Sequence, residues 1–278
     1  RKQITKHFVK KLEDNKMKKI AIITGASSGM GQRFCYEIDK LGLDEVWGVA
    51  LNDEATETAQ HMKTPFKYIS LDLTKDESFK TLDAELKKED IAVEWLINAS
   101  GYGKFGRYDE ISIEDQLGMI DLNCKALTHL TLLTIPYMPA GGRIVEFGSI
   151  AAFQPIPYIG VYGASKAYVL SYSRALNREL KSKKISVTCL CPYWTKTKFF
   201  DRATKTNAKQ KVITKYVAMY DPEKVIKRAM KGAMKRKDVV LYGFVSKAQT
   251  AMVKLLPHKW VMSIWERQQK FKKTYKDR

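Results

Sequence analysis

The sequence predicts an α/β fold, in which a doubly wound parallel β-sheet carries helices on both faces. Short apolar, strand-like runs alternate with helical segments along most of the 278 residues, an order typical of parallel sheets. A glycine-rich turn joins the first of these runs to the first helix. Neither an internal repeat nor a low-complexity linker divides the chain. We therefore expect one domain over residues 17–243, followed by a basic helical extension over residues 244–278.

The first expected strand, Lys18–Thr24, is a short β-branched apolar run that leads directly into the glycine-rich turn. The last strand of the first half, Val93–Asn98, runs into Ala99-Ser100-Gly101. Between them we expect a helix at Gly31–Leu41, a strand at Glu45–Leu51, a strand at Lys67–Leu71 and a helix at Asp76–Glu89.

The second half begins with a long expected helix at Ile113–Tyr137, which has Pro136 near its end. Further along, Asp221-Pro222-Glu223 favours a helix start, because it offers an N-cap acid and a proline in the first turn. The other expected elements are a strand at Gly142–Phe147, a helix at Val161–Lys181, a strand at Ile185–Leu190, a helix from Asp221 to about Arg236 and a strand at Asp238–Tyr242.

The positive charge is concentrated at the two ends of the chain. Of the net charge of +19, residues 1–19 carry +6 and residues 202–278 carry +16, whereas residues 20–201 carry −3. Met17 directly precedes the first strand, so we interpret residues 1–16 as a basic arm. No apolar run is long enough to cross a bilayer, and the amino-terminal residues lack the apolar stretch of a secretory signal.

Four cysteines, Cys35, Cys124, Cys189 and Cys191, are few for a disulfide framework. Cys189 and Cys191 end an apolar strand and share one of its faces, without histidine or carboxylate partners at ligand spacing. We therefore expect buried thiols, no metal site and a reducing cytoplasmic location.

The turn from Thr24 to Gly31 has the form Gly-x-x-x-Gly-x-Gly and leads from a strand into a helix. Such a place suits the pyrophosphate of a dinucleotide, because glycines allow close backbone approach and a helix amino terminus favours negative charge. Taken alone, the turn could equally be an ordinary glycine-rich connection. The residues expected to contact a cofactor here are Gly25, Ser27, Ser28, Gly29, Met30 and Gly31.

Tyr162 and Lys166 lie one helical turn apart, on the same face of their expected helix. A free phenol titrates at about pH 10, and a nearby ammonium favours the phenolate, so the lysine would help the tyrosine exchange protons nearer neutrality. Ser149 precedes the tyrosine by thirteen residues, at the end of an expected strand. A Tyr-x-x-x-Lys pattern alone is more often a solvated helix face, so the combination matters.

In order and spacing, these residues resemble the short-chain dehydrogenase/reductase family. The resemblance runs from Thr24 to about Thr197, and includes Asn123 between the glycine turn and Ser149. It implies a Rossmann-like fold and an NAD(P)(H)-dependent oxidoreductase that interconverts a secondary alcohol and a carbonyl compound. The alternative is a catalytically idle dinucleotide-binding scaffold or regulatory protein whose basic arms contact partners or a membrane surface.

The resemblance also implies a role for each catalytic residue. Tyr162 is the general acid/base, and Lys166 both tunes the tyrosine and binds the nicotinamide ribose. Ser149 orients the substrate oxygen, and Asn123 holds a water in the proton relay. The intact set of these residues argues against the idle scaffold.

Cofactor choice is expected to depend on the end of the second strand. By resemblance, Ala50 stands where an NAD-selecting acid would be, Leu51 takes the usual arginine position and Asn52 follows. The absence of an acid at Ala50 favours NADP(H) over NAD(H). The absence of an arginine at Leu51 weakens this preference, because no cation is present to bind the 2′-phosphate. Asp72 and Leu73, after the third strand, are expected near the adenine, with a helix-proximal cap as an almost equal alternative for Asp72.

Two further segments resemble the family's cofactor contacts. Asn98, Ala99 and Ser100 resemble its Asn-Asn-Ala-Gly segment, and for Asn98 a structural role close to the cofactor is expected. The residues from Cys191 to Thr197 resemble its Pro-Gly loop beside the nicotinamide, with a tyrosine in place of the glycine. The cofactor contacts expected in this loop are Pro192, Thr195 and Thr197.

The carboxy-terminal extension has two apolar helical stripes, separated at Pro257. The favoured interpretation buries both stripes, including Trp260, Ile264, Trp265 and Phe271, against the core or a sister subunit, near the substrate opening or a subunit interface. The alternative is a basic amphipathic surface that lies on an anionic membrane. The expected partners are a small alcohol or carbonyl substrate, apolar in character, and further copies of the chain in a homodimer or homotetramer, but not nucleic acid.

Overall fold

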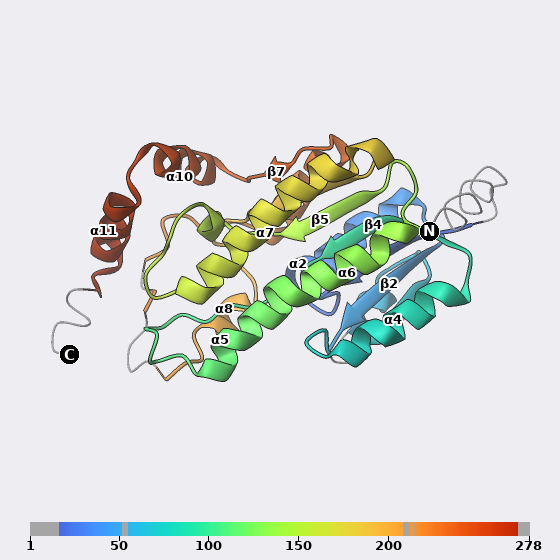
Figure 1. The fold of residues 1–278 in the computed structure, drawn as a ribbon, viewed down its shortest axis with the longest axis horizontal. Coiled ribbons are helices and arrows are strands. Elements are labelled where there is room, and N and C mark those ends of the chain that lie inside the picture. Colours follow the sequence, from blue (N-terminus) through green and yellow to red (C-terminus); the bar gives the residue numbers. More distant parts are fainter. Residues whose placement is uncertain (1–16, 52–54, 208–211, 214, 272–278) are drawn as a thin grey trace.

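The computed structural model describes residues 17–51, 55–207, 212–213 and 215–271, so the predicted basic arm at residues 1–16 lies outside it. Within these residues a seven-stranded, fully parallel sheet has the strand order β3-β2-β1-β4-β5-β6-β7. Helices cover both faces of the sheet (Figure 1). The predicted doubly wound α/β fold is therefore confirmed.

The strands lie close to their predicted positions. They are β1 (Lys18–Thr24), β2 (Glu45–Ala50), β3 (Phe66–Ser70), β4 (Ile91–Asn98), β5 (Arg143–Phe147), β6 (Ser186–Leu190) and β7 (Val239–Val240). The last strand is shorter than predicted, because only two of its residues pair with β6.

The helices alternate with these strands and then continue beyond them. They are α2 (Gly29–Ile38), α3 (Ala55–Gln60), α4 (Asp76–Lys88), α5 (Ile113–Ile120), α6 (Leu127–Thr134), α7 (Gly160–Glu179), α8 (Phe199–Ala203), α9 (Pro222–Met234), α10 (Phe244–Leu255) and α11 (His258–Gln269). The short helices α3 and α8 were not predicted from the sequence.

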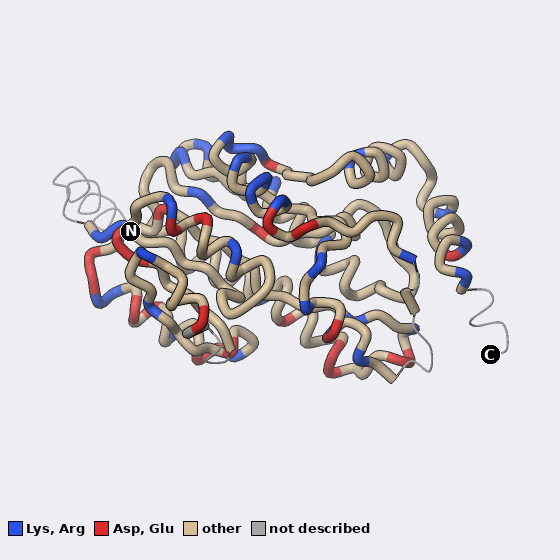
Figure 2. The backbone as a smooth tube through the Cα atoms, turned by 180° about the vertical axis from the view of Figure 1, so that it is seen from behind, with Lys and Arg blue, Asp and Glu red and all other residues tan. Residues whose placement is uncertain are grey.

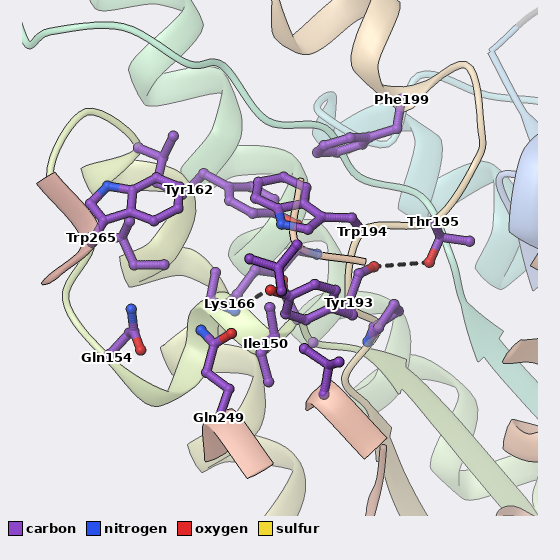
Figure 3. A pocket seen from close by; sticks show the side chains of 18 of the residues that line it. Ile150, Gln154, Tyr162, Lys166, Tyr193, Trp194, Thr195, Phe199, Gln249 and Trp265 are labelled. Atoms are coloured by element: carbon purple, nitrogen blue, oxygen red, sulfur yellow. Dashed lines mark hydrogen bonds between the residues drawn. The ribbon is translucent and has the colours of Figure 1, made fainter. Parts of the chain in front are cut away.

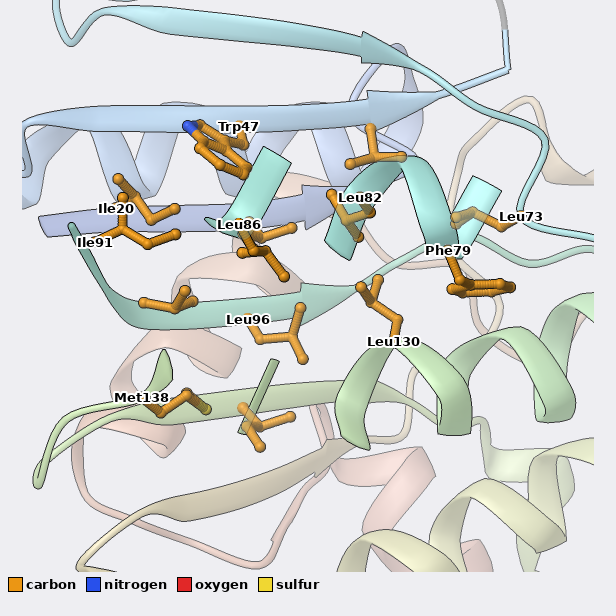
Figure 4. Packing of buried hydrophobic residues seen from close by; sticks show 14 of the residues in the cluster. Ile20, Trp47, Leu73, Phe79, Leu82, Leu86, Ile91, Leu96, Leu130 and Met138 are labelled. Carbon is orange, nitrogen blue, oxygen red and sulfur yellow. The ribbon is translucent and has the colours of Figure 1, made fainter. Parts of the chain in front are cut away.

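The two faces of the sheet have separate apolar cores. Figure 4 shows the face on which α4 and α6 pack, where Phe79, Leu82 and Leu130 meet Trp47 and Leu96. On the other face, α2 and α9 pack against alternate residues of the same strands. Burying each large apolar side chain contributes about 1.5–3 kcal/mol relative to leaving it in water, so the two layers hold the sheet rigidly.

An irregularity in β4 changes which side chains face which core. Val93 pairs with Ile20, but the next residue of β1 pairs with Trp95, so one residue of β4 is left out of the register. Beyond this bulge, side chains lie on the face opposite to the one that strict alternation predicts. Asn98 therefore lies on the same face of the sheet as Leu96, towards α6.

The single long helix predicted at Ile113–Tyr137 is wrong in one respect. Between α5 and α6 the chain forms a π-helical turn, η2 (Asp121–Ala126), and a short 3-10 turn, η3 (Ile135–Tyr137), ends the run. A π turn accommodates an extra residue and changes which side chains face inward. In this turn Asn123 is fully buried.

The carboxyl ends of the parallel strands meet at one edge of the sheet, where open α/β sheets place their ligands. The last two helices, α10 and α11, lie beyond this edge and project from the body of the domain (Figure 1). α10 packs against the 3-10 turn η4 (Ile150–Phe153), which follows β5. In the described part of the chain, no helix combines the length and apolar character needed to span a bilayer.

Candidate active site

A cavity of about 580 Å³ opens at the carboxyl edge of the sheet. Its walls come from the glycine-rich turn, η4, α7, the loop after β6 and the two carboxy-terminal helices. Figure 3 shows labelled side chains from η4, α7, this loop and α10 around the space. Ser149, Tyr162 and Lys166 all line it, together with Met30 and Thr197, so the structure brings the predicted catalytic residues to the predicted cofactor turn.

The start of α7 places Tyr162 and Lys166 side by side. Because the helix begins at Gly160, both residues lie in its first two turns and face the end of β5. Nζ of Lys166 donates a 2.7 Å hydrogen bond to the backbone oxygen of Phe147 and lies 5.7 Å from the centroid of the Tyr162 ring. The lysine is thus held against the strand end, close to the phenol.

Ser149 occupies the turn between β5 and α7. It is the N-cap of η4, and its hydroxyl oxygen accepts a hydrogen bond of 3.1 Å from the backbone N–H of Ala151. Ser149 is also hydrogen-bonded to Tyr162. The serine hydroxyl is therefore fixed beside the phenol, on the wall of the cavity.

Burial controls the protonation of the two neighbouring groups. Burial raises the pKa of the Tyr162 phenol to about 12, and the hydrogen bond to Ser149 only partly offsets this. Burial lowers the pKa of the Lys166 ammonium to about 8. Burial thus sets the direction of the pKa shift of both groups.

Asn123, on the π-helical turn, forms hydrogen bonds with the backbone of Tyr102 in the segment that follows β4. Its Oδ1 accepts a 3.1 Å hydrogen bond from the backbone N–H of Tyr102, and its Nδ2 donates to the backbone oxygen of the same residue at 2.9 Å. Nδ2 also donates to Oγ of Ser165 on α7, at 3.0 Å. A side chain at Gly101 would come within 2.8 Å of Asn123 Oδ1, so only a glycine fits this close approach. The asparagine thus joins three parts of the site wall.

Asn98 lies behind the cavity rather than in it. Its Nδ2 donates to Oγ1 of Thr131 at 2.9 Å and to both carboxylate oxygens of Glu146 at 3.1 Å. Thr131 donates to Glu146 as well, at 2.8 Å. This fully buried group braces β4 and β5 beneath Lys166, which agrees with the structural role expected for Asn98.

Glu146→Gln is expected to stabilise the protein above pH 7 and to change it little near pH 5. Burial raises the pKa of Glu146 from 4.5 to about 7 in the folded chain. Between these values the folded state holds a proton that the unfolded state has lost, so stability falls as pH rises through this window. By linkage, the carboxyl costs about 3 kcal/mol at the upper end.

Glutamine keeps the shape of the side chain without its charge, and its Nε2 replaces one of the two oxygens that accept a hydrogen bond from Asn98 Nδ2. Thermal unfolding of both proteins across this pH range measures the effect. Parallel curves for the variant and the parent would show that Glu146 does not titrate in this way.

The glycine-rich turn fits a dinucleotide. Gly25 and Gly29 have φ of 66° and 60°, in the left-handed region that favours glycine. A Cβ on Gly31 would come within 2.2 Å of the backbone oxygen of Gly25, so no side chain fits there. The turn ends at Ser28, the N-cap of α2, which leaves the first backbone N–H groups of the helix for negative phosphates.

The other predicted cofactor residues divide between the cavity wall and its surroundings. Ala99, Pro192 and Thr195 line the cavity, while the backbone N–H of Ser100 donates to Oγ1 of Thr24 at 2.9 Å. Ser27 lies within the glycine-rich turn. In the loop after β6, the ring of Tyr193 packs against Tyr220, with ring centroids 6.1 Å apart.

The residues expected near the adenine of the cofactor lie in different environments. Leu51 is 67% exposed at the end of β2, and Asn52 lies outside the described residues. Oδ1 of Asp72 accepts hydrogen bonds from the N–H and hydroxyl of Thr74, so it caps the turn before α4. Leu73 is buried in the apolar core.

Part of the cavity wall comes from residues outside the family motifs that were not named as site residues from the sequence. Gln154, directly after η4, and Trp265 on α11 line it, and Gln249 and Met252 line it from α10. Figure 3 shows the amides of Gln154 and Gln249 and the ring of Trp265 around the same cavity. The only signal for them in the sequence was the pair of apolar stripes, whose direction depends on how the extension packs.

The expectation that these stripes are buried is confirmed for two residues and wrong for two others. Trp265 and Phe271 are buried and pack against each other, and Nε1 of Trp265 donates to the backbone oxygen of Pro157 at 3.1 Å. Trp260 and Ile264 are 60% and 46% exposed, because they lie on the outer side of α11.

Sulfur and carboxylate groups in the described residues form no cluster suited to a metal ion. Cys189 and Cys191 are buried with their Sγ atoms 3.6 Å apart, and all four thiols are free. The burial of Cys189 and Cys191 agrees with their interpretation as small buried apolar residues, whereas Cys124 is only half-buried.

Known proteins share the sequence pattern and the fold of this chain. Residues 19–208 match the family described as short chain dehydrogenase. An uncharacterized oxidoreductase of Staphylococcus epidermidis is 28% identical over 176 residues, which make up 63% of this chain and 76% of that protein. A very-long-chain 3-oxoacyl-CoA reductase of Bos taurus is 28% identical over 188 residues, 64% of this chain and 60% of that protein.

Solved structures show the same fold. A short-chain dehydrogenase from Sphingobium yanoikuyae in complex with NADPH has a TM-score of 0.70 and 24% identity, covering 87% of this chain and 97% of that one. A short chain dehydrogenase/reductase from Burkholderia phymatum in complex with NAD has a TM-score of 0.72 and 22% identity, covering 86% and 92%.

Proposed function

Because the chain belongs to the short-chain dehydrogenase family, we propose that this oxidoreductase interconverts a secondary alcohol and a carbonyl compound with NAD(P)(H), using Tyr162 as general acid/base. One observation carries the proposal. The phenol of Tyr162, the hydroxyl of Ser149 and the amine of Lys166 share the wall of a cavity that also reaches the glycine-rich turn.

Each residue has a defined task in this proposal. The nicotinamide cofactor supplies or accepts the hydride when it is bound. Tyr162 exchanges a proton with the substrate oxygen, and Ser149 donates a hydrogen bond that orients this oxygen. Lys166, held by the Phe147 carbonyl, offers its amine to a ribose and stabilises the phenolate as it forms. Asn123 holds the surrounding wall in place through its hydrogen bonds to Tyr102 and Ser165. It also holds a water molecule in the path by which the proton leaves or reaches Tyr162.

The proposed substrate is a bulky, mainly apolar alcohol or ketone. Around the catalytic groups the cavity is lined by aromatic and aliphatic side chains, which include Phe105, Ile156, Trp194 and Trp265. Such a wall favours apolar substrates, because it cannot satisfy the hydrogen bonds of a sugar. The amides of Gln154 and Gln249 are polar exceptions, suited to a second polar group on the substrate.

A turnover assay with a panel of ketones and alcohols tests the proposal against the idle scaffold. Cofactor binding is measured separately by calorimetry, so that a missing substrate is not mistaken for a missing site. We expect oxidation or reduction of at least one bulky apolar member. Tight cofactor binding without turnover of any member would favour the scaffold instead.

NADP(H) is the cofactor we propose, because no acid stands at the end of β2 to repel a 2′-phosphate. Ala50 ends this strand, and the exposed Leu51 follows it. Leu51→Arg is expected to tighten NADP(H) binding about tenfold and to leave NAD(H) binding nearly unchanged, since the guanidinium adds a phosphate partner. Leu51→Gln is the uncharged control.

Titration of both cofactors at equal salt measures the preference in the parent and both variants. Tighter binding of NAD(H) than NADP(H) by the parent would reverse the proposed preference. An equal gain for both cofactors in Leu51→Arg would show that residue 51 lies away from the 2′-phosphate.

We also propose a homo-oligomer and a reducing cytoplasmic compartment. Exposed apolar side chains on α5, α6 and α7 support the assembly, since a monomer seldom exposes such a group; they are Ile113, Leu117, Leu132 and Tyr168. The four free thiols fit a reducing compartment.

A further inference from the structure

The helix α10 has its apolar side facing outward. The residues that it turns towards η4 include Ser246 and Thr250, whose hydroxyls donate to backbone oxygens one helical turn back, at 2.6 and 2.8 Å. Phe244 and Leu255 are the first and last residues of α10. Both lie on the side of the helix opposite to Ser246 and Thr250, and the side chain of each is 83% exposed. A surface helix of a globular protein normally has the reverse arrangement. We therefore expect this side of α10 to bind an apolar partner rather than to remain exposed to water.

The outer side of α11 continues the same apolar surface. Trp260 and Ile264 are exposed there, one helical turn apart. The outward surface of α10 and α11, made by Phe244, Met252, Leu255, Trp260 and Ile264, is called the apolar rim below. Phe244, Met252 and Ile264 also line the catalytic cavity, so the apolar rim borders the site on one side.

Positive charge flanks the apolar rim. Lys247 and Lys254 lie on α10 at one border of its apolar side, and Lys259 and Arg267 lie on α11; all four are exposed. Glu266 is the one acid between residues 244 and 271. Figure 2 shows this part of the chain with several blue segments and little red. Cations beside exposed tryptophan and leucine match the headgroup and acyl layers of an anionic bilayer.

We propose that α10 and α11 dock on the surface of an anionic lipid membrane, which the apolar rim enters, and that apolar substrates reach the catalytic cavity from the lipid. The delivery of substrate depends on the proposed function, but the docking does not. Self-association through the same surface explains the apolar residues but not the lysines, which would face one another across a two-fold interface. The exposed side chains of α5 and α6 already offer a different apolar surface for a second copy.

Cosedimentation of the full chain with vesicles tests the docking. We expect binding to phosphatidylcholine vesicles that contain about 30% phosphatidylglycerol, weak binding to phosphatidylcholine alone, and release as ionic strength rises. The triple variant Lys247→Glu, Lys254→Glu, Lys259→Glu should bind the anionic vesicles about a hundredfold more weakly, at roughly a fivefold loss or more for each charge.

A charge-matched variant controls for net charge. Lys181→Glu, Lys183→Glu and Lys235→Glu change exposed residues at the opposite edge of the sheet, after α7 and α9. This variant should bind nearly as well as the parent. If both triple variants lost binding equally, the attraction would come from overall charge and the proposed docking surface would be wrong.

An apolar variant distinguishes a membrane from a second copy of the chain. Leu255→Ser with Trp260→Ser, neither of which lines the cavity, should lower vesicle affinity about tenfold without changing molecular mass in solution. Ile113→Ser with Leu132→Ser, on α5 and α6, is the matched control and should leave vesicle affinity unchanged. A lower mass for Leu255→Ser/Trp260→Ser, with no vesicle binding by the parent, would assign the apolar rim to self-association and overturn the proposal.

Turnover tests the delivery of substrate separately. With an apolar ketone dissolved in vesicles, Leu255→Ser/Trp260→Ser should raise KM about tenfold, whereas kcat with a small water-soluble ketone should not change. Vesicle binding without any turnover would reject the proposed function and leave the docking intact. Equal kinetics of parent and variant on the vesicle substrate would reject delivery from the lipid.

Discussion

Tyr162→Phe is expected to lower kcat by about a thousandfold, because it removes the group that exchanges a proton with the substrate oxygen. The ring should keep its place, since it packs against Phe105 and Phe199, with centroids 6.4 and 5.6 Å away. Cofactor affinity should therefore change little. This combination separates a chemical role for the phenol from a structural one.

Steady-state kinetics and calorimetric titration with the cofactor measure the two quantities. Phe105→Leu is a useful companion, because it alters the packing around the ring without removing the phenol. A Tyr162→Phe enzyme that retained near-normal kcat would contradict the proposed mechanism. Loss of cofactor binding together with a lowered melting temperature would point to a structural defect.

Lys166→Ala is expected to reduce both kcat and cofactor affinity, each by at least about tenfold, because one amine has two proposed tasks. The ammonium lies 5.7 Å from the Tyr162 ring centroid, close enough to stabilise a phenolate as the proton leaves. Its 2.7 Å hydrogen bond to Phe147 holds it on the cavity wall, where a ribose hydroxyl can reach it.

Lys166→Arg is the matched variant, since it keeps a positive charge but cannot place it at the same point. If the charge alone matters, the arginine variant recovers part of kcat. If only one of the two quantities falls in Lys166→Ala, the other role of the lysine has to be withdrawn. Melting temperatures of both variants exclude a general loss of structure.

Features formed within a few consecutive residues were predictable from the sequence. The spacing of Tyr162 and Lys166 puts both on one side of any helix, and the structure confirms that helix. The glycine-rich turn was equally readable, since Gly25 and Gly29 adopt φ values that favour glycine. The central strands were recognisable because they are short apolar runs buried on both faces of the sheet, whereas the edge strand β3 is only partly buried.

The direction in which distant side chains face was decided by tertiary structure. The bulge in β4 reverses the alternation that the sequence predicts, and so brings Asn98 to Thr131 and Glu146. The π-helical turn that buries Asn123 has no signal in the residue pattern, because an ordinary α-helix accommodates the same residues. Both arrangements depend on partners far along the chain.

The sequence by itself determined the fold class, the glycine-rich turn and the pair of catalytic candidates on α7, because each depends on local backbone geometry and on apolar periodicity. Tertiary structure decided the direction of the pKa shifts at the site, since burial is a property of the whole fold and is the largest cause of the shift for both Tyr162 and Lys166. It also decided that α10 and α11 close one side of the cavity while Leu255 and Trp260 face outward. An amphipathic pattern states that a helix has an apolar side, but only the packing of the surrounding chain determines whether that side meets the core or the solvent.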